Sequence, residues 1–486
     1  MAISENPTAA AVPGVPARHL TRQGLSNPAT VFLLLSALFG TLTAVLTPPL
    51  CAPDEAAHFM RAYGLSQGEI IPSRADEKGR KGVYLPARLY REFDFFDAAR
   101  YQVNVQHFDY RRVMSEYLRR RAASASTRSD GAAVFVLYAG SEGYSPVAYL
   151  PYVAAVALAR LIDLDFAGTL YLMRFAGLAA MTAVVAYAIA VVPGLGWTFL
   201  CIAMLPAALY GRSVVSADGS ALAYVMAIAA LSLRAVASVD AGRPLERSLW
   251  MMLCGLSKPP QLAFILLEAM QQPLRDLPSV WRRFALVTLP AVLVVLFWAV
   301  ASFGEMATWR LTDHGFAPEQ FDAVWKLRFM LEHPFHFPKL LIGSLQNPFE
   351  LWRQLIGILG WLDAALQPWV YPAASLFLFA TFLARLDLDS RQRRRVALVA
   401  GVTALTYCLA VYGIFYLFWT PTDSDHVHGI QGRYFVVALP AFAIAAAAIL
   451  NRAPGHNVTA ALAIVGAMLS GAATIEAVLR VDWKIW

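Results

Sequence analysis

Two adjacent carboxylates, Asp54 and Glu55, stand shortly after the first long apolar segment of the chain, residues 31–48. Carboxylates this close to hydrocarbon are costly unless they have a partner or a task. A carboxylate whose pKa is raised by partial burial can act as a general base that takes a proton from a hydroxyl group. The structural alternative is a helix N-cap, because Pro-Asp-Glu is typical of a first helical turn. The two interpretations are compatible, and at least one carboxylate is a candidate catalytic residue.

Two further polar side chains follow on the helix that Asp54 would open. His58 and Arg61 lie about one turn apart, so the pattern predicts that Asp54, His58 and Arg61 share a helix face. Such a face is either one wall of a binding site or a surface ion pair, and the sequence leaves both open.

Three charged residues occur at membrane-facing positions later in the chain. Arg174 lies near the start of an apolar segment, where it would bind a phosphate, pair with an acidic neighbour or extend to the interface. Asp218 opens another apolar segment and is either a helix cap or a site carboxylate. Lys258, in Ser-Lys-Pro-Pro, interrupts an apolar region where prolines stop helices, and we expect it to contact a phosphate or a site carboxylate.

The stretch 420–434 gathers four side chains that are able to bind metals: Asp423, Asp425, His426 and His428. They would bind a divalent cation or form an ordinary solvated loop. Arg433, with Gln431 and Tyr434 beside it, is the stronger candidate, because a guanidinium matches the oxygens of a phosphate.

The elements that must position these residues are membrane helices. The 486 residues are 58% hydrophobic and 15% charged, and the mean hydropathy is +0.51. Apolar runs of spanning length recur along the whole chain, which predicts an all-α polytopic membrane protein. We expect about eleven crossings, at 31–48, 169–191, 196–211, 219–237, 248–256, 259–272, 284–303, 370–386, 396–418, 433–450 and 456–478.

Charges in the short loops predict the orientation of these helices. Residues 1–28 form a tail whose Arg18 and Arg22 place it inside the cell, and 29–486 form a single transmembrane domain. A retained signal-anchor is favoured over a cleaved signal peptide, because the first apolar run is long. Asp54, Asp218, Lys258 and Arg433 then fall at the outer face, and the C-terminus lies outside.

Two long outer segments are expected, 49–168 and 304–369. The first should carry short surface helices at 87–100 and 113–121 and an irregular loop at 122–131. Residues 146–162 are either a re-entrant or interfacial helix, which we favour, or a marginal crossing. The second should contain an amphipathic stretch, 351–366, on the membrane surface.

Several functional classes are excluded or disfavoured. The net charge of +7 lies largely in short loops, so it does not indicate nucleic-acid binding. Four scattered cysteines form neither a disulfide framework nor a zinc spacing. No phosphate-binding glycine loop or serine-hydrolase elbow occurs.

Taken together, the order of these residues resembles the GT-C superfamily of integral-membrane glycosyltransferases. The resemblance rests on one helix, a long outer loop opening with an acidic motif, an Arg in the second span, and then an Asp and a Lys-Pro. More narrowly, the chain resembles a bacterial family of predicted membrane proteins that is grouped with that superfamily. The stretches concerned are Pro53-Asp54-Glu55 with His58-Phe59 and Arg61-Ala62-Tyr63, Ser257-Lys258-Pro259-Pro260, Gly360-Trp361-Leu362-Asp363 and Gln431-Gly432-Arg433-Tyr434-Phe435.

The resemblance implies transfer of a sugar, with inversion expected, from a polyprenyl-phosphate donor to a glycan or lipid acceptor of the cell envelope. Asp54 or Glu55 would be the base. Substrate or phosphate would be held by His58, Arg61, Arg174, Asp218, Lys258, Gln431, Arg433 and Tyr434. Some relatives use a divalent cation such as Mg or Mn, but the Asp-Glu pattern here leaves a metal unassigned. The implied location is the outer face of the bacterial cytoplasmic membrane, in contact with membrane lipid. The alternative function is a transporter, polymerase or ligase of lipid-linked oligosaccharide.

Overall fold

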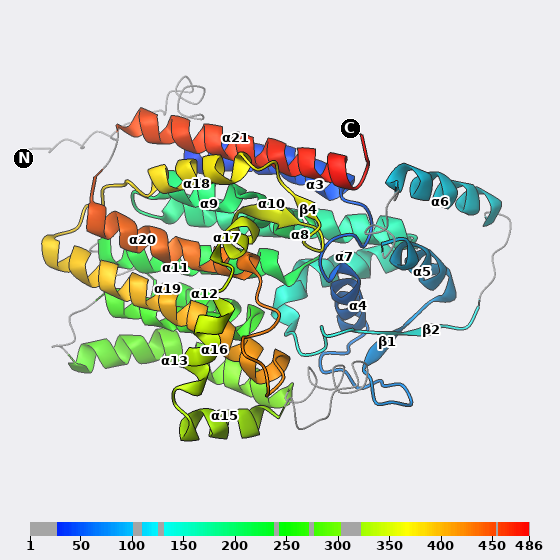
Figure 1. Cartoon of the computed structure of the whole chain (residues 1–486), viewed down its shortest axis with the longest axis horizontal. Coiled ribbons are helices and arrows are strands. Elements are labelled where there is room, and N and C mark those ends of the chain that lie inside the picture. The colour runs from blue at the N-terminus through cyan, green and yellow to red at the C-terminus, as the bar shows by residue number, and fades with distance from the viewer. Residues whose placement is uncertain are drawn as a thin grey trace, which may run out of the picture.

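The computed structural model describes residues 27–100, 109–124, 131–237, 243–271, 277–302, 322–452 and 455–485. Helices dominate these residues, as expected from the composition (Figure 1). The predicted tail, 1–28, lies almost entirely outside the described residues. In Figure 1 most helices run side by side, and α4 (Glu55–Ser66), α5 (Ala87–Arg100) and α6 (Tyr110–Ser124) gather at one end of this bundle.

Seven helices of the described chain are long and apolar enough to cross a membrane: Pro28–Leu46, Phe166–Val191, Ala217–Ala237, Phe284–Ala301, Ser390–Trp419, Gly432–Leu450 and Asn457–Val481. In the same order, they correspond to α2 (Pro28–Leu35) continued into α3 (Thr41–Leu46), α8, α11, α13 (Leu277–Ala301), α19, the 3₁₀ helix η5 (Gly432–Ala438) continued into α20 (Leu439–Leu450), and α21 (His456–Val481). All seven coincide with predicted crossings. The chain is therefore a polytopic helical membrane protein.

The other predicted crossings are shorter or broken. The stretch 196–211 divides into α9 (Gly196–Met204) and α10 (Pro206–Ser213), because Pro206 has no amide hydrogen to continue a helix. The stretch 370–386 holds α18 (Val370–Thr381), and the expected hairpin consists of α12 (Pro244–Ser257) and the 3₁₀ helix η3 (Pro259–Met270). The count of eleven crossings thus remains a prediction.

The segment 49–168, predicted to be the first outer segment, contains the two surface helices that the sequence predicted, α5 and α6. A strand pair was not predicted: β1 (Gly82–Leu85) pairs antiparallel with β2 (Val134–Leu137). Of the expected loop at 122–131, residues 122–124 continue α6, and 125–130 lie outside the described residues. Residues 146–162 hold the 3₁₀ helix η2 (Pro146–Tyr149) and α7 (Leu150–Leu161), an apolar helix shorter than the seven spans.

The segment 304–369, predicted to be the second outer segment, contains α15 (Ala323–Glu332), α16 (His336–Ser344) and α17 (Pro348–Gly357) among its described residues. The predicted amphipathic stretch 351–366 is helical only in its first part, since α17 ends at Gly357. The strands β3 (Ile358–Leu359) and β4 (Ala364–Ala365) pair directly after it. The left-handed backbone at Gly360 and Leu362 turns the chain between these strands.

Two large apolar cores hold the described chain together. One unites the spanning helices α2, α8, α11, α19, α20 and α21. The other packs α4, α5, α6 and α7 against the start of α8. Since α4 belongs to the second core and α11 contributes to both, the helices that carry Asp54 and Asp218 have fixed positions relative to each other.

Candidate active site

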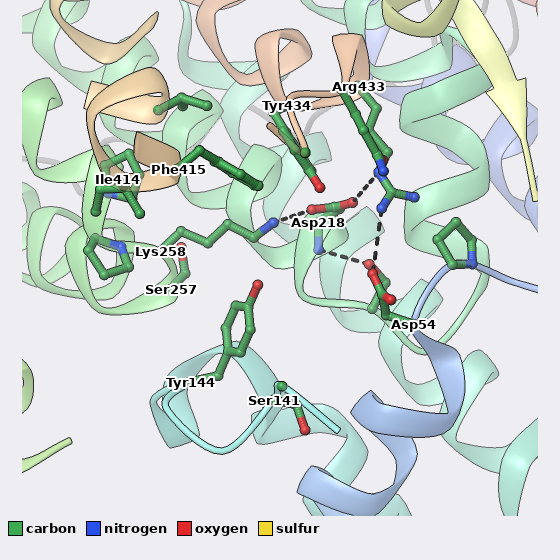
Figure 2. Close-up of a pocket in the computed structure, with 18 of the residues that line it drawn as sticks. Asp54, Ser141, Tyr144, Asp218, Ser257, Lys258, Ile414, Phe415, Arg433 and Tyr434 are labelled. Atoms are coloured by element: carbon green, nitrogen blue, oxygen red, sulfur yellow. Dashed lines mark hydrogen bonds and ion pairs between the residues drawn. The ribbon is translucent and has the colours of Figure 1, made fainter. Parts of the chain in front are cut away.

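Four charged side chains meet at a cavity of about 760 Å³. Arg433 lies 3.6 Å from the Asp54 carboxylate and 3.7 Å from the Asp218 carboxylate. The ammonium group of Lys258 pairs with Asp218. Figure 2 shows Arg433 between the two carboxylates and Lys258 reaching Asp218 from another side. We call these four residues the ion cluster.

Each member of the ion cluster stands at the start or end of a helix. Asp54 immediately precedes α4 in a left-handed conformation, with φ of 55°, and its side chain makes no capping hydrogen bond. Asp218 lies in the first turn of α11, and Lys258 joins α12 to η3. Because these termini converge, side chains that are up to 379 positions apart in the sequence (Asp54 and Arg433) share one site.

The position of Arg433 depends on Gly432, the residue before it. A Cβ atom at Gly432 would collide with the backbone carbonyl of Leu351 in α17. The amide of Gly432 also donates to the side-chain oxygen of Gln354, at 2.8 Å. The absence of a side chain at Gly432 therefore lets η5 (Gly432–Ala438) press against α17, which places Arg433 at the cavity.

The four charges differ in exposure and in how firmly they are held. The side chain of Asp54 is 51% exposed, whereas those of Asp218, Lys258 and Arg433 are 30%, 19% and 15% exposed. Asp54 is therefore the carboxylate available to a ligand, while Asp218 is bound by both cations.

His58, Gln431 and Tyr434 also line the cavity, as predicted. The His58 ring lies 2.6 Å from the hydroxyl of Tyr149, and burial lowers the pKa of His58 to about 4. His58 is therefore neutral at physiological pH and suited to hydrogen bonding. The ring of Tyr434 lies 5.5 Å from the Lys258 ammonium, which allows a cation–π contact.

Two polar atoms at the cavity are left without a hydrogen bond. Within the described chain, no donor reaches Gln431 Oε1, and no acceptor lies within hydrogen-bond distance of Arg433 Nε. Buried polar atoms are normally paired, so these two are exceptions, and neither atom is itself accessible to solvent.

Glu55 and Arg174 do not line the cavity, although both were predicted as site residues. Both side chains are fully buried, and the carboxylate and guanidinium form a two-pronged ion pair with distances of 2.8 and 2.6 Å. The amides of Leu50 and Val215 also donate to Glu55. The predicted roles of Glu55 as a base and of Arg174 as a phosphate ligand are therefore corrected, because each group is already occupied by the other. The alternative of an acidic partner for Arg174 is confirmed.

Arg61 is likewise buried outside the cavity. It donates to the carbonyls of Glu69, Ile70 and Tyr144 at 2.7–3.3 Å. The expectation that Arg61 forms a site wall or a surface ion pair was wrong, since these carbonyls engage it internally. Arg61 instead fixes the loop that carries Tyr144, whose hydroxyl points toward the ion cluster in Figure 2.

The histidine-rich loop does not assemble a metal site. His426 lies 2.6 Å from Asp425 and stacks on His428, with ring centroids 4.4 Å apart. No cluster of three or more potential metal ligands occurs among the described residues. In the ion cluster, both carboxylates face cations instead of a vacant coordination site.

Several residues of the cavity wall were not predicted from sequence. Ser141 is one of them. Tyr149 was not predicted either; it orients His58 from 91 positions away but does not line the cavity. Apart from Glu142, the sequence next to these two residues is uncharged, and it has no spacing that indicates a site. The aromatic residues Tyr144 and Trp361 also line the cavity.

The model of one protein family, described as "Predicted membrane protein (DUF2142)", matches residues 36–442. This match spans the ion cluster and most of the chain. It confirms the narrower resemblance to a family of predicted membrane proteins. No curated protein matches the chain, and no solved structure does.

Proposed function

We propose that this chain, a member of the DUF2142 family of predicted membrane proteins, is a glycosyltransferase of the bacterial cytoplasmic membrane. It would move a sugar from a polyprenyl-phosphate donor to a glycan or lipid acceptor at the outer face. The observation that carries this proposal is the ion cluster, which holds the half-exposed carboxylate of Asp54 beside Arg433, and Lys258 beside Asp218, at a largely apolar cavity.

The proposed reaction assigns a separate role to each side of the ion cluster. Asp54 takes the proton of the acceptor hydroxyl, and the acceptor oxygen then forms a bond to the anomeric carbon of the sugar. The bond between that carbon and the phosphate oxygen breaks, and the electron pair leaves with the polyprenyl phosphate. Lys258 and Arg433 stabilise the charge that develops on the phosphate. The cationic character of the sugar in the transition state also favours nearby carboxylates.

Asp218 acts on the two cations. It pairs with Lys258 and lies 3.7 Å from Arg433, so it holds both side chains in the cavity while no donor is bound. An arriving phosphate competes with Asp218 for these cations. Gln431 also lines the cavity, where its side-chain amide would contact a sugar hydroxyl.

Lipid-linked sugars in a deletion strain test the proposal. The strain should accumulate a polyprenyl-phosphate sugar and lack one glycan or lipid modification, and the wild-type chain should restore both. Asp54→Asn should fail to restore transfer while folding normally, because this carboxylate is half exposed.

Asp163→Asn is the matched control. Asp163 shares with Asp54 a left-handed backbone and an exposed carboxylate, but it lies outside the cavity. It should restore transfer fully. Full restoration by Asp54→Asn as well would exclude Asp54 as the base. Unchanged lipid-linked sugars in the deletion strain would contradict glycosyl transfer itself.

A further inference from the structure

The apolar part of the cavity extends between two spanning helices, away from the ion cluster. Val295 and Trp298 of α13 line one side of it, and Val411, Ile414 and Phe418 of α19 line the other. Both helices are strongly apolar, and only 22% and 33% of their most apolar segments are buried in the described fold. Their remaining surfaces face hydrocarbon, because a spanning helix that is not covered by protein is covered by lipid.

Three residues mark an opening of the cavity at the ends of these helices. Ala299, Val324 and Trp419 all line the cavity, yet each has an exposed side chain. Val324 is 60% exposed and Trp419 is 37% exposed. Since Ala299 and Trp419 stand near the ends of spanning helices, this opening lies where the bundle reaches the membrane surface, next to α15.

The helix α15 begins at the opening and carries an apolar stripe. Val324, Leu327 and Leu331 recur at helical spacing and are 60%, 51% and 78% exposed. Phe335 and Ile342, before and within α16, are 84% and 73% exposed. We call these five residues the apolar stripe. Such a surface is unusual in contact with water and typical of a helix at a membrane surface.

The opposite side of α15 is fixed to the protein. Lys326 is fully buried, and its ammonium donates to the carbonyls of Tyr416, Leu417 and Thr420 at the end of α19. A cation at the C-terminal end of a helix is favoured by the partial negative charge there. In α16, Leu340 packs with Tyr416 in a small apolar core. These contacts hold the apolar stripe on the outward side.

We propose that α15 and α16 lie on the bilayer with the apolar stripe in its hydrocarbon boundary, and that the cavity opens beside them to lipid. The occupant of the apolar stripe is the acyl region of the bilayer. The opening lets the hydrocarbon chain of a lipid ligand enter sideways while its polar head remains at the ion cluster. The contact between the apolar stripe and the bilayer, called the surface contact below, does not depend on sugar transfer. The identity of the lipid ligand rests on the proposed function.

Fluorescent labels on single introduced cysteines test both the surface contact of the apolar stripe and the lateral opening of the cavity. Val324→Cys reports on the opening, Leu331→Cys on the apolar stripe, and Leu118→Cys on a control surface. Leu118 is 56% exposed on α6, among ion pairs such as Arg120–Glu116, so it should face water. The unsubstituted chain measures background labelling, since its described cysteines are buried or half-buried. Each full-length variant is reconstituted in phosphatidylcholine vesicles with either ordinary or brominated acyl chains, and iodide is added to the aqueous phase.

Brominated chains should quench the labels at Val324 and Leu331, and iodide should quench the label at Leu118. Quenching of the Leu331 label by iodide and not by brominated lipid would overturn the surface contact. Quenching of the Val324 label by iodide alone would overturn the lateral opening, even with Leu331 in lipid. A variant that does not elute as the unsubstituted chain does is replaced by Leu327→Cys for the apolar stripe or Ala299→Cys for the opening.

Discussion

Replacing Arg174 with methionine should destabilise the protein through the charge that it leaves behind. The guanidinium donates two hydrogen bonds to Glu55 and three to the carbonyls of Ala44, Thr47 and Pro48. All five of its N–H groups are thus used. Methionine fills much of the space but supplies no donor. The Glu55 carboxylate would remain fully buried with two backbone amides as its partners.

The expected loss is about 3–5 kcal/mol, the usual cost of removing one partner from a buried ion pair. A loss of this size is large against the total stability of a typical domain, about 5–15 kcal/mol. Glu55→Gln should cost a similar amount, because it leaves a buried guanidinium whose partners, the glutamine and three carbonyls, are all neutral. Losing both groups should cost less than the sum of the single losses, since no buried charge is then left unpaired.

Unfolding in mixed micelles, followed by circular dichroism, measures these free energies for the two single variants and the double variant. The coupling between the two sites should reach about 1–3 kcal/mol. Arg88→Met is the matched control, because Arg88 pairs with Asp163 at 3.1 Å on the exposed surface. Its loss should be about 0–1 kcal/mol.

Single losses as small as that of Arg88→Met would refute the reasoning. Additive losses in the double variant would also refute it, because they would show that Glu55 and Arg174 do not stabilise each other. Activity separates the buried pair from the ion cluster. Arg174→Met should lower activity in parallel with the amount of folded protein, whereas Asp54→Asn should lower activity in folded protein.

Three further predictions concern the cavity. In a binding titration with undecaprenyl phosphate, Lys258→Met should weaken the affinity about tenfold or more, because a charged hydrogen bond contributes about 1.5–3 kcal/mol. Lys258→Arg should retain part of the affinity in the same titration. Gly432→Ala should lower the free energy of unfolding by about 1–3 kcal/mol, because the added methyl group overpacks against Leu351. Gly413→Ala, in open space on α19, should raise the free energy of unfolding by about 0.4–1 kcal/mol. Equal thermal unfolding of the two variants would contradict this prediction. Burial lowers the pKa of His58 to about 4, so between that value and its ordinary 6.5 the unfolded chain binds a proton that the folded chain does not. Stability should therefore fall as the pH drops from about 6.5 toward 4, and His58→Gln should flatten this part of the unfolding profile.

The sequence by itself determined the membrane character, the positions of seven spans and the surface helices α5 and α6. These follow from local composition and from periodicity, which need no knowledge of distant residues. The sequence also singled out Asp54, Asp218, Lys258 and Arg433, because a charge at the end of an apolar run is costly wherever the helix packs.

The tertiary structure decided what each charge contacts. Asp54 and Glu55 are neighbours in the sequence, yet the left-handed backbone at Asp54 separates their surroundings: one carboxylate reaches the cavity and the other reaches Arg174, 119 positions away. Arg61 and Arg174 have the same side chain as Arg433, but buried carbonyls and a buried carboxylate engage the first two. The partner of a buried charge depends on which distant helix packs beside it, so the sequence around one charged residue does not predict its partner.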